Sequence, residues 1–210
     1  GGGGPGAGPV VLSQRLAPYM PVPYVLKNAD GYTLVEQGTA KEPGRLKGFH
    51  GQMGMFIRAL CYCLSHGADG LHTASGDAVL NANYILARLQ HIMSAPFPGP
   101  CMHEALFDDS FLKDTGVTTL DFAKAMIDEG YHPMTMYFPL VVHGALLIEP
   151  TESESRQSLD EFISVLESLA ARAKAGEVDH FTSAPRFTPR RRLDETRAAR
   201  QPVLRWKEEL

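Results

Sequence analysis

The sequence contains few cysteines, one tryptophan and almost no excess of charge. Its 210 residues include three cysteines, and the formal net charge is −4. A secreted, disulfide-stabilised domain more often carries an even, spaced set of cysteines. A nearly balanced charge favours neither nucleic acid nor a membrane surface as a partner. No apolar run approaches the roughly 20 residues that cross a bilayer, and no secretory leader is visible. These absences predict a cytoplasmic protein.

A metal site is also not expected. Cys61 and Cys63 are separated by one residue, and neither a second cysteine pair nor suitably spaced histidines accompany them. Zinc sites need such sets. We therefore predict that Cys61, Cys63 and Cys101 are buried thiols of a hydrophobic core.

The region 134–176 predicts two strands followed by a helix. Two short apolar runs, 134–138 and 145–148, flank Pro139 and the pair His143-Gly144, which is typical of a β-hairpin. A Thr/Ser/Glu cluster at 151–155 offers acceptors to the free N–H groups of a helix start. Apolar residues then recur with helical spacing from Leu159 to Ala173, and Gly176 ends the pattern.

The remaining patterns predict an α+β organisation with a boundary near residue 72. We expect a small hairpin from 24–26 and 32–35, a buried helix over 55–64 and a second helix over 75–89. A strand over 101–107, which would contain His103 and Glu104, and a helix over 120–127 follow. The order strand, helix, strand, strand, helix is typical of one sheet with helices on one face.

The two ends differ from the middle. Residues 1–8, GGGGPGAG, cannot hold a regular element, so they are either a linker or a loop pressed against an anionic cofactor. Residues 184–207 are rich in arginine and proline, and such a tail is solvated or lies over an acidic neighbour. Trp206 near the end favours docking of the tail.

Several segments together resemble one family. These are GGGGPGAGP at the start, LNANY at 80–84, the pair His103-Glu104, and FP…GALLIEPTESES over 138–155. They resemble glycine dehydrogenase (decarboxylating), the P-protein of the glycine cleavage system. The tail TPRRRLDETRAARQPVLRW is similar to the end of the second subunit in the two-subunit form.

The resemblance implies an α/β fold of the type I pyridoxal-phosphate enzymes. Residues 1–72 would be the end of the large cofactor-binding domain, 73–176 the small C-terminal α+β domain, and 177–210 a basic tail. The implied reaction decarboxylates glycine on pyridoxal 5'-phosphate and passes the aminomethyl group to the lipoyl arm of the H-protein. The implied partners are the first P-protein subunit, in a heterotetramer, and the lipoylated H-protein.

The resemblance also implies where site residues lie. The lysine that binds the cofactor would precede Gly1, so we expect no catalytic residue in this chain and no activity from the chain alone. Implied cofactor neighbours are Gly1, Gly2, Gly3 and Gly4. Candidates for the substrate site are His50, His103 and Glu104, although a loop histidine such as His50 is more often simply solvated. Gln52 and the pair Ala105-Leu106 depart from the family pattern, which leaves the site residues open.

Two alternatives remain from the sequence. Another type I pyridoxal-phosphate enzyme, an aminotransferase or a decarboxylase, would need an arginine to hold a substrate carboxylate. Residues 73–155 offer Arg88 alone, on the polar side of its helix. The third hypothesis is a non-catalytic interaction module. A His-Lys pair just before Gly1 in the reading frame would favour the enzyme.

Overall fold

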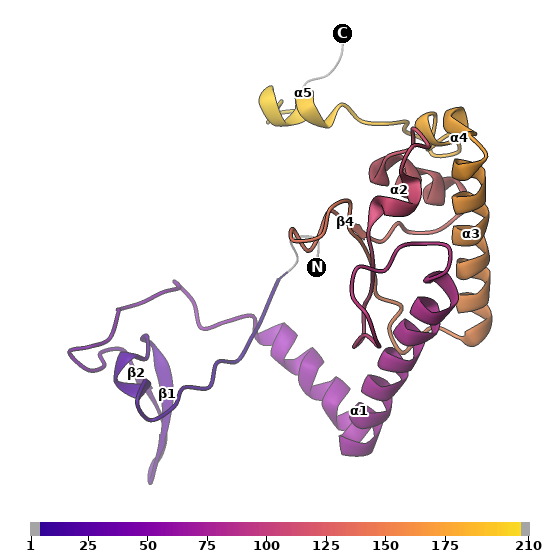
Figure 1. The fold of residues 1–210 in the computed structure, drawn as a ribbon. Helices are drawn as coiled ribbons and strands as arrows, with labels where there is room; N and C mark the ends of the chain where they lie inside the picture. The colour runs from indigo at the N-terminus through magenta and orange to yellow at the C-terminus, as the bar shows by residue number, and fades with distance from the viewer. Residues whose placement is uncertain (1–4, 207–210) are drawn as a thin grey trace. The chain divides into compact units, whose positions relative to one another are not determined.

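The computed structural model describes residues 5–206, and these fall into two compact units. The first unit is Gly1–Leu71 and the second is His72–Leu210. Each unit has its own secondary structure (Figure 1). The predicted cofactor neighbours Gly1, Gly2, Gly3 and Gly4 lie outside the described residues.

The first unit contains the small hairpin that the sequence predicts. Strand β1 (Tyr24–Asn28) pairs antiparallel with β2 (Gly31–Val35), and a short 3-10 helix, η1 (Ala17–Tyr19), precedes them. The Asn28 side chain accepts a hydrogen bond from the Asp30 N–H at 3.1 Å, and Gly31 has a φ of +122°. An asparagine and a glycine of this kind close tight turns, so the local sequence sets this hairpin.

Helix α1 (Met53–Leu89) replaces the two separate helices that we expected. Its helical geometry is interrupted at Gly67, which has φ +62° and ψ −174°. The helix resumes directly after Gly67, which is earlier than the predicted start at Ser75. Gly70 and Gly76 each lower helix propensity by about 1 kcal/mol. That cost is small beside the burial of Ile85 and Leu89 further along.

The prediction that 55–64 forms a core helix with buried cysteines is wrong for this chain. Ile57 and Leu60 are each 56% exposed, and Cys61 and Cys63 are also exposed. Among the described residues before His72, the core includes only Val22. An apolar helix becomes buried only when another element covers it, and no described element of the first unit does so.

The second unit is built on a three-stranded antiparallel sheet. Its strands are β3 (Ala105–Phe107), β4 (Thr135–Met136) and β5 (Leu146–Ile148), in the order β3-β5-β4. The predicted pairing of the second hairpin is confirmed, since Thr135 lies opposite Leu147. Side chains alternate along the strands, so Ala105, Phe107, Leu146 and Ile148 are buried while Leu106 and Leu147 are partly exposed.

Two predicted helices of this unit are confirmed. Helix α2 (Thr119–Asp128) begins with a capping box, in which Thr118 and Asp121 each accept a hydrogen bond from the other's backbone N–H. Helix α3 (Arg156–Lys174) begins at Ser155, whose hydroxyl accepts from the Ser158 N–H at 3.1 Å. Figure 1 shows α3 running along one side of the unit.

A single hydrophobic core joins α1, the sheet, α2 and α3. Its fully buried members include Leu89 from α1 and Phe107 from β3, together with a run of small and branched residues on α3. The rings of Phe111 and Phe122 meet edge to face at 5.3 Å, and the rings of Phe122 and Phe181 stack at 6.2 Å. Aromatic pairs at these separations stabilise a core beyond the area that they bury.

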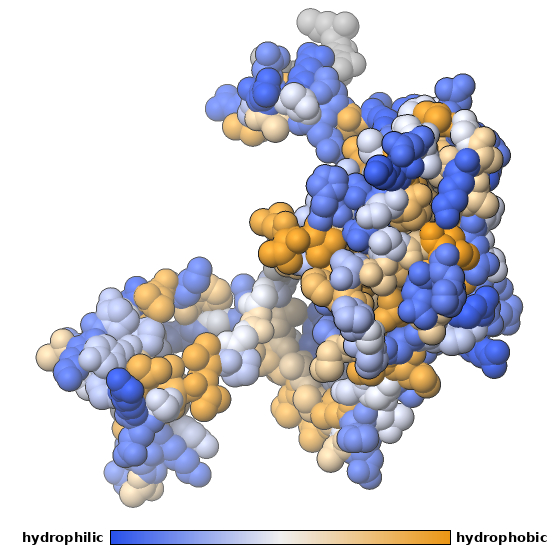
Figure 2. Space-filling model, viewed as in Figure 1, coloured by the Kyte–Doolittle hydropathy of each residue, from blue (hydrophilic) through white to orange (hydrophobic). Residues whose placement is uncertain are grey.

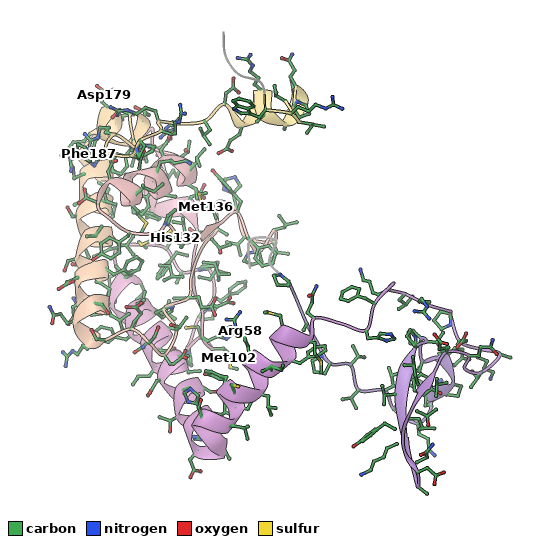
Figure 3. All side chains as sticks on the ribbon, turned by 180° about the vertical axis from the view of Figure 1, so that it is seen from behind. Arg58, Met102, His132, Met136, Asp179 and Phe187 are labelled. Atoms are coloured by element: carbon green, nitrogen blue, oxygen red, sulfur yellow. The ribbon has the colours of Figure 1, made fainter. Side chains whose placement is uncertain are left out.

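The core does not stop at Gly176, where the sequence pattern places the start of the tail. Helix α4 (Val178–Thr182) carries the fully buried Phe181, and Ala184 is buried as well. Asp179 and Phe187 lie at this end of the unit (Figure 3). A 3-10 helix, η2 (Asp109–Leu112), also contributes Phe111 and Leu112 to this core. Residues up to Ala184 therefore belong to the packed second unit.

Two aspartates on α2 hold the following arginine-rich segment. Asp128, whose side chain is 1% exposed, accepts from the Arg186 backbone N–H at 2.6 Å and from its Nε at 3.1 Å. Asp121 pairs with Arg192 at 2.6 Å, and the same guanidinium donates to the carbonyls of Phe181 and Ala184. The expectation that the basic tail lies over acidic groups is confirmed for these two arginines.

The end of the tail behaves differently. Helix α5 (Glu195–Arg200) has no buried residue, and Trp206 is 86% exposed. The prediction that Trp206 docks the tail is wrong for this chain, because nothing described covers its ring.

Asp128→Ala should destabilise the second unit by about 3 kcal/mol, because a buried ion pair loses one partner and the backbone N–H groups of Arg186 and Phe187 lose their acceptor. Urea unfolding followed by circular dichroism measures this. Asp179→Ala removes an exposed carboxylate from α4 and should stay within about 0.5 kcal/mol of the parent protein. Equal losses in both variants would contradict the anchoring role of Asp128.

The same carboxylates predict a loss of stability in acid. Burial alone raises the pKa of Asp121 and of Asp128, but hydrogen bonds from Thr118 to Asp121, and from Phe187 and Arg186 to Asp128, outweigh it, so both pKa values lie below 3.8. A carboxyl group whose pKa is lower in the folded than in the unfolded protein stabilises the fold at pH values above its unfolded pKa, which is near 4. This contribution is lost as the pH falls through the folded pKa. Unfolding free energies between pH 6 and pH 2 should therefore fall less steeply in Asp121→Asn/Asp128→Asn than in the parent. Equal slopes of unfolding free energy against pH in the variant and in the parent would contradict this.

Candidate functional site

A cleft of about 380 Å³ lies on the second unit. Leu106 and Leu147, which face each other across β3 and β5, lie on the sheet face opposite to the one that carries the core residues. The rest of the lining comes from the proline-rich loop before β3, from the loop after β4 and from α1. These residues are Leu86, Phe97, Pro98, Gly99, Pro100, Cys101, Met102, Glu104, Phe138 and Pro139.

Glu104 is the one carboxylate among the residues that line this cleft. It is half-buried, and its carboxylate forms no hydrogen bond or ion pair with the described residues. Cys101 is the other ionisable group there, and burial raises the pKa of its thiol. A half-buried carboxylate on apolar walls can accept hydrogen bonds from an amine or a hydroxyl of a ligand.

His103 and Glu104 do not lie in a strand, as the sequence pattern predicted. Strand β3 starts at Ala105, and the segment 101–104 is an irregular bend. The reason is local: the backbone of Cys101 is bonded to the Asn83 side chain and not to a neighbouring strand. Glu104 lines the cleft, while His103 is exposed. Met102 also extends outward from this loop (Figure 3).

His50 lies on an exposed loop of the first unit, before α1. It belongs to a different unit from His103 and Glu104. Its role at a substrate site stays a prediction.

The loop between β4 and β5 forms an apolar rim beside the cleft. Leu140 is 88% exposed and Val141 is 86% exposed, and the hydrophobic side chains of this loop stand at the surface (Figure 2). Tyr137, with φ +57°, starts the loop, and its hydroxyl accepts from the Leu120 N–H at 3.2 Å. The sequence pattern predicted a turn here but not its attachment to α2.

A further hydrogen bond and an ion pair fix the far end of that loop. The Thr119 hydroxyl donates to the Gly144 carbonyl at 3.1 Å. His143 Nδ1 lies 2.9 Å from Asp109 Oδ1, and this bond raises the pKa of His143. The apolar rim is therefore held by its two ends while its tip stays exposed.

The cleft does not fit the phosphate of pyridoxal phosphate. A phosphate group is bound by arginine, lysine or clustered backbone N–H groups, and the lining residues of this cleft include no lysine, arginine or histidine. A second cleft of about 350 Å³ is lined by Glu149 and Glu154 and by one basic side chain, that of His132. Within residues 5–206 no group of side chains is arranged to hold a metal ion. No described helix is long and apolar enough to cross a membrane.

Arg88 is not available as a carboxylate clamp of the aminotransferase type. Its guanidinium donates to the Tyr84 hydroxyl at 2.9 Å and pairs with Asp160 at 3.1 Å, and a longer contact of 4.0 Å joins it to Glu167. It connects α1 to α3 on the surface of the unit. This arrangement weighs against the alternative of another type I pyridoxal-phosphate enzyme.

A family model described as "Glycine dehydrogenase, C-terminal domain" matches residues 74–186. This segment covers more than half of the chain and ends two residues after the buried Ala184. The chain belongs to this glycine dehydrogenase family. The resemblance that the EPTESES segment carries is thereby confirmed.

Relatives extend the match to nearly the whole chain. A probable glycine dehydrogenase (decarboxylating) subunit 2 of Caulobacter vibrioides is 64% identical over 99% of this chain and 40% of its own length. A protein of the same description from Oceanobacillus iheyensis is 45% identical over 98% of the chain and 42% of its own length. The chain thus spans about two fifths of the length of these relatives.

A solved structure shares the fold. The crystal structure of a glycine decarboxylase (P-protein) in inhibitor-bound form matches with a TM-score of 0.57 and 16% identity. The match covers 74% of this chain and 37% of that chain. The predicted fold class, an α/β pyridoxal-phosphate enzyme fold represented by its C-terminal part, is confirmed.

Gly144→Ala should destabilise the second unit more than Gly130→Ala. Both glycines have positive φ, which costs a residue with a side chain roughly 1–3 kcal/mol. At Gly144 a Cβ would also clash with the carboxylate carbon of Asp109, whereas at Gly130 nothing lies within 4 Å. Thermal unfolding of the two variants measures the difference. Equal melting temperatures would contradict the close contact between the apolar rim and Asp109.

Proposed function

We propose that this chain is the C-terminal part of subunit 2 of a glycine dehydrogenase (decarboxylating). The observation that carries the proposal is the 64% identity to such a subunit over 99% of the chain. In the proposed reaction glycine loses its carboxyl group as CO₂, and the aminomethyl group passes to the lipoyl arm of an H-protein. The enzyme would be a cytoplasmic heterotetramer with the first P-protein subunit.

The cofactor of the proposed enzyme is pyridoxal 5'-phosphate, and residues outside 5–206 would hold it. The cleft that Glu104 lines supports this division, because its lining includes no arginine, lysine or histidine to bind a phosphate. Gly1 to Gly4, which we predict to lie beside the cofactor, are outside 5–206 as well. We expect the chain alone to be inactive.

Residues 1–72 would form the end of the large cofactor-binding domain. The support is the exposed apolar surface of α1, where Ile57, Leu60 and Leu64 lie at the surface of the first unit. Exposed apolar surface of this kind is typical of a segment that another element covers in the whole protein. The second unit, with the matched segment 74–186, would be the small C-terminal domain.

Glu104 is the residue of the second unit that we assign to the substrate site. Its carboxylate lies on apolar walls and has no partner among the described residues, so it can accept a hydrogen bond from a ligand amine. Apolar walls reduce the water around a bound ligand and thereby strengthen that bond. His103 and His50 are exposed and would contribute less.

Glu104→Gln should lower the enzyme's activity about 10- to 100-fold, since a hydrogen bond to a charged group contributes about 1.5–3 kcal/mol. The measurement is the exchange of labelled bicarbonate into the carboxyl group of glycine, with full-length subunit 2, its partner subunit, H-protein and pyridoxal phosphate. Glu195→Gln, at the exposed start of α5, is the matched control and should keep the parent rate.

The outcomes separate the hypotheses. Exchange by the parent complex supports the enzyme, and loss of exchange in Glu104→Gln alone supports the assignment of Glu104. A correctly assembled parent complex without exchange would reject the enzyme and favour the non-catalytic interaction module, to which the exposed Leu140 and Val141 would be suited.

A further inference from the structure

The Asn83 side chain holds the loop that carries Glu104. Its Nδ2 donates to the Cys101 carbonyl at 2.7 Å, and its Oδ1 accepts from the Cys101 N–H at 2.9 Å. The same Nδ2 also donates to the Val79 carbonyl, one turn back on α1, at 2.8 Å. One amide thus replaces the two hydrogen bonds that a neighbouring strand would give to Cys101.

The Asn81 side chain holds a different loop. Its Nδ2 donates to the Thr151 carbonyl at 2.9 Å and to the Glu154 carbonyl at 3.3 Å. Thr151 has φ +61°, a conformation that is costly for a residue with a branched side chain. The amide of Asn81 therefore supports a strained turn in the EPTESES segment, directly before the N-terminus of α3.

The two asparagines act from one rigid stretch of helix. They are two residues apart, which directs their side chains about 200° apart around the helix axis. Ala82 between them and Ile85 just after them are fully buried, so the backbone of this stretch is fixed by the core. One turn of α1 can therefore position two loops on opposite sides.

We propose that Asn83 is a positioning residue for the reaction, through the loop of Glu104, and that Asn81 on the same turn of helix fixes the loop 149–155. This inference rests on the proposed function, since it takes Glu104 as part of the substrate site. The LNANY segment then serves as a clamp on two loops, and neither asparagine touches substrate. Glu104 is three residues beyond Cys101, so release of Cys101 changes the position of its carboxylate in the cleft.

The clamp can be measured without any activity. The Cys101 thiol is half-buried and its pKa is raised by burial, so it should react slowly with iodoacetamide while Asn83 holds the loop. In the full-length two-subunit enzyme, Asn83→Ala should raise the alkylation rate of Cys101 at least about fivefold, as read from peptide masses. Asn81→Ala should leave this rate unchanged and should instead speed cleavage after Glu152 and Glu154 by a glutamyl endopeptidase.

Asn83→Asp keeps the acceptor for the Cys101 N–H but places a carboxylate oxygen beside the carbonyls of Cys101 and Val79 in place of the donor, so its alkylation rate should also exceed that of the parent. This variant also serves where Asn83→Ala does not fold. Gln157→Ala is the matched control, because its amide makes one exposed hydrogen bond, to Glu161. It should change neither readout.

The activity readout tests the link to the reaction. Asn83→Ala should lower the rate of bicarbonate exchange at least about tenfold, and Asn83→Asp should lower it as well. Unchanged Cys101 reactivity in Asn83→Ala overturns the clamp, and faster alkylation with parental exchange overturns its role in the reaction. If the parent complex does not exchange bicarbonate, the proposed function fails, while the alkylation and cleavage patterns still decide the clamp.

Discussion

Burial of one face of a very small sheet is the constraint on which the second unit depends. Strands of two and three residues are too short to be stable alone, because their few hydrogen bonds do not offset the entropy of ordering the chain. Phe107 and Leu146 on that face share one core with Leu89 of α1 and with Ile163 of α3. The helices stabilise the sheet, and the sheet in turn leaves its second face free.

The candidate site uses that second face. Leu106 and Leu147 are paired neighbours whose side chains point away from the core, and together they help to line the cleft that Glu104 enters. The loops around this cleft are held by side chains from helices: Asn83 on α1, and Thr119 on α2. A site built on loops can be well ordered when rigid elements hold its backbone.

Charge has a separate role at the other end of the unit. Asp121 and Asp128 on α2 hold Arg192 and Arg186, and both carboxylates are almost fully buried. A buried carboxylate without a cation would be costly, so these pairs bind the start of the tail firmly. Beyond them, α5 and Trp206 are exposed and form no such ion pair with any residue of the range 5–206.

The sequence by itself determined the elements whose signal is local. The hairpins, α2 and α3 follow from turn residues, caps and helical spacing, and the family follows from the EPTESES segment. Only the tertiary structure decided burial and pairing between distant segments. It placed Glu104 in a cleft outside the strand, joined Asn83 to Cys101, and left Cys61 and Cys63 exposed. The physical reason is that burial and side-chain pairing depend on what packs against a residue, and residue spacing within one segment does not contain that information.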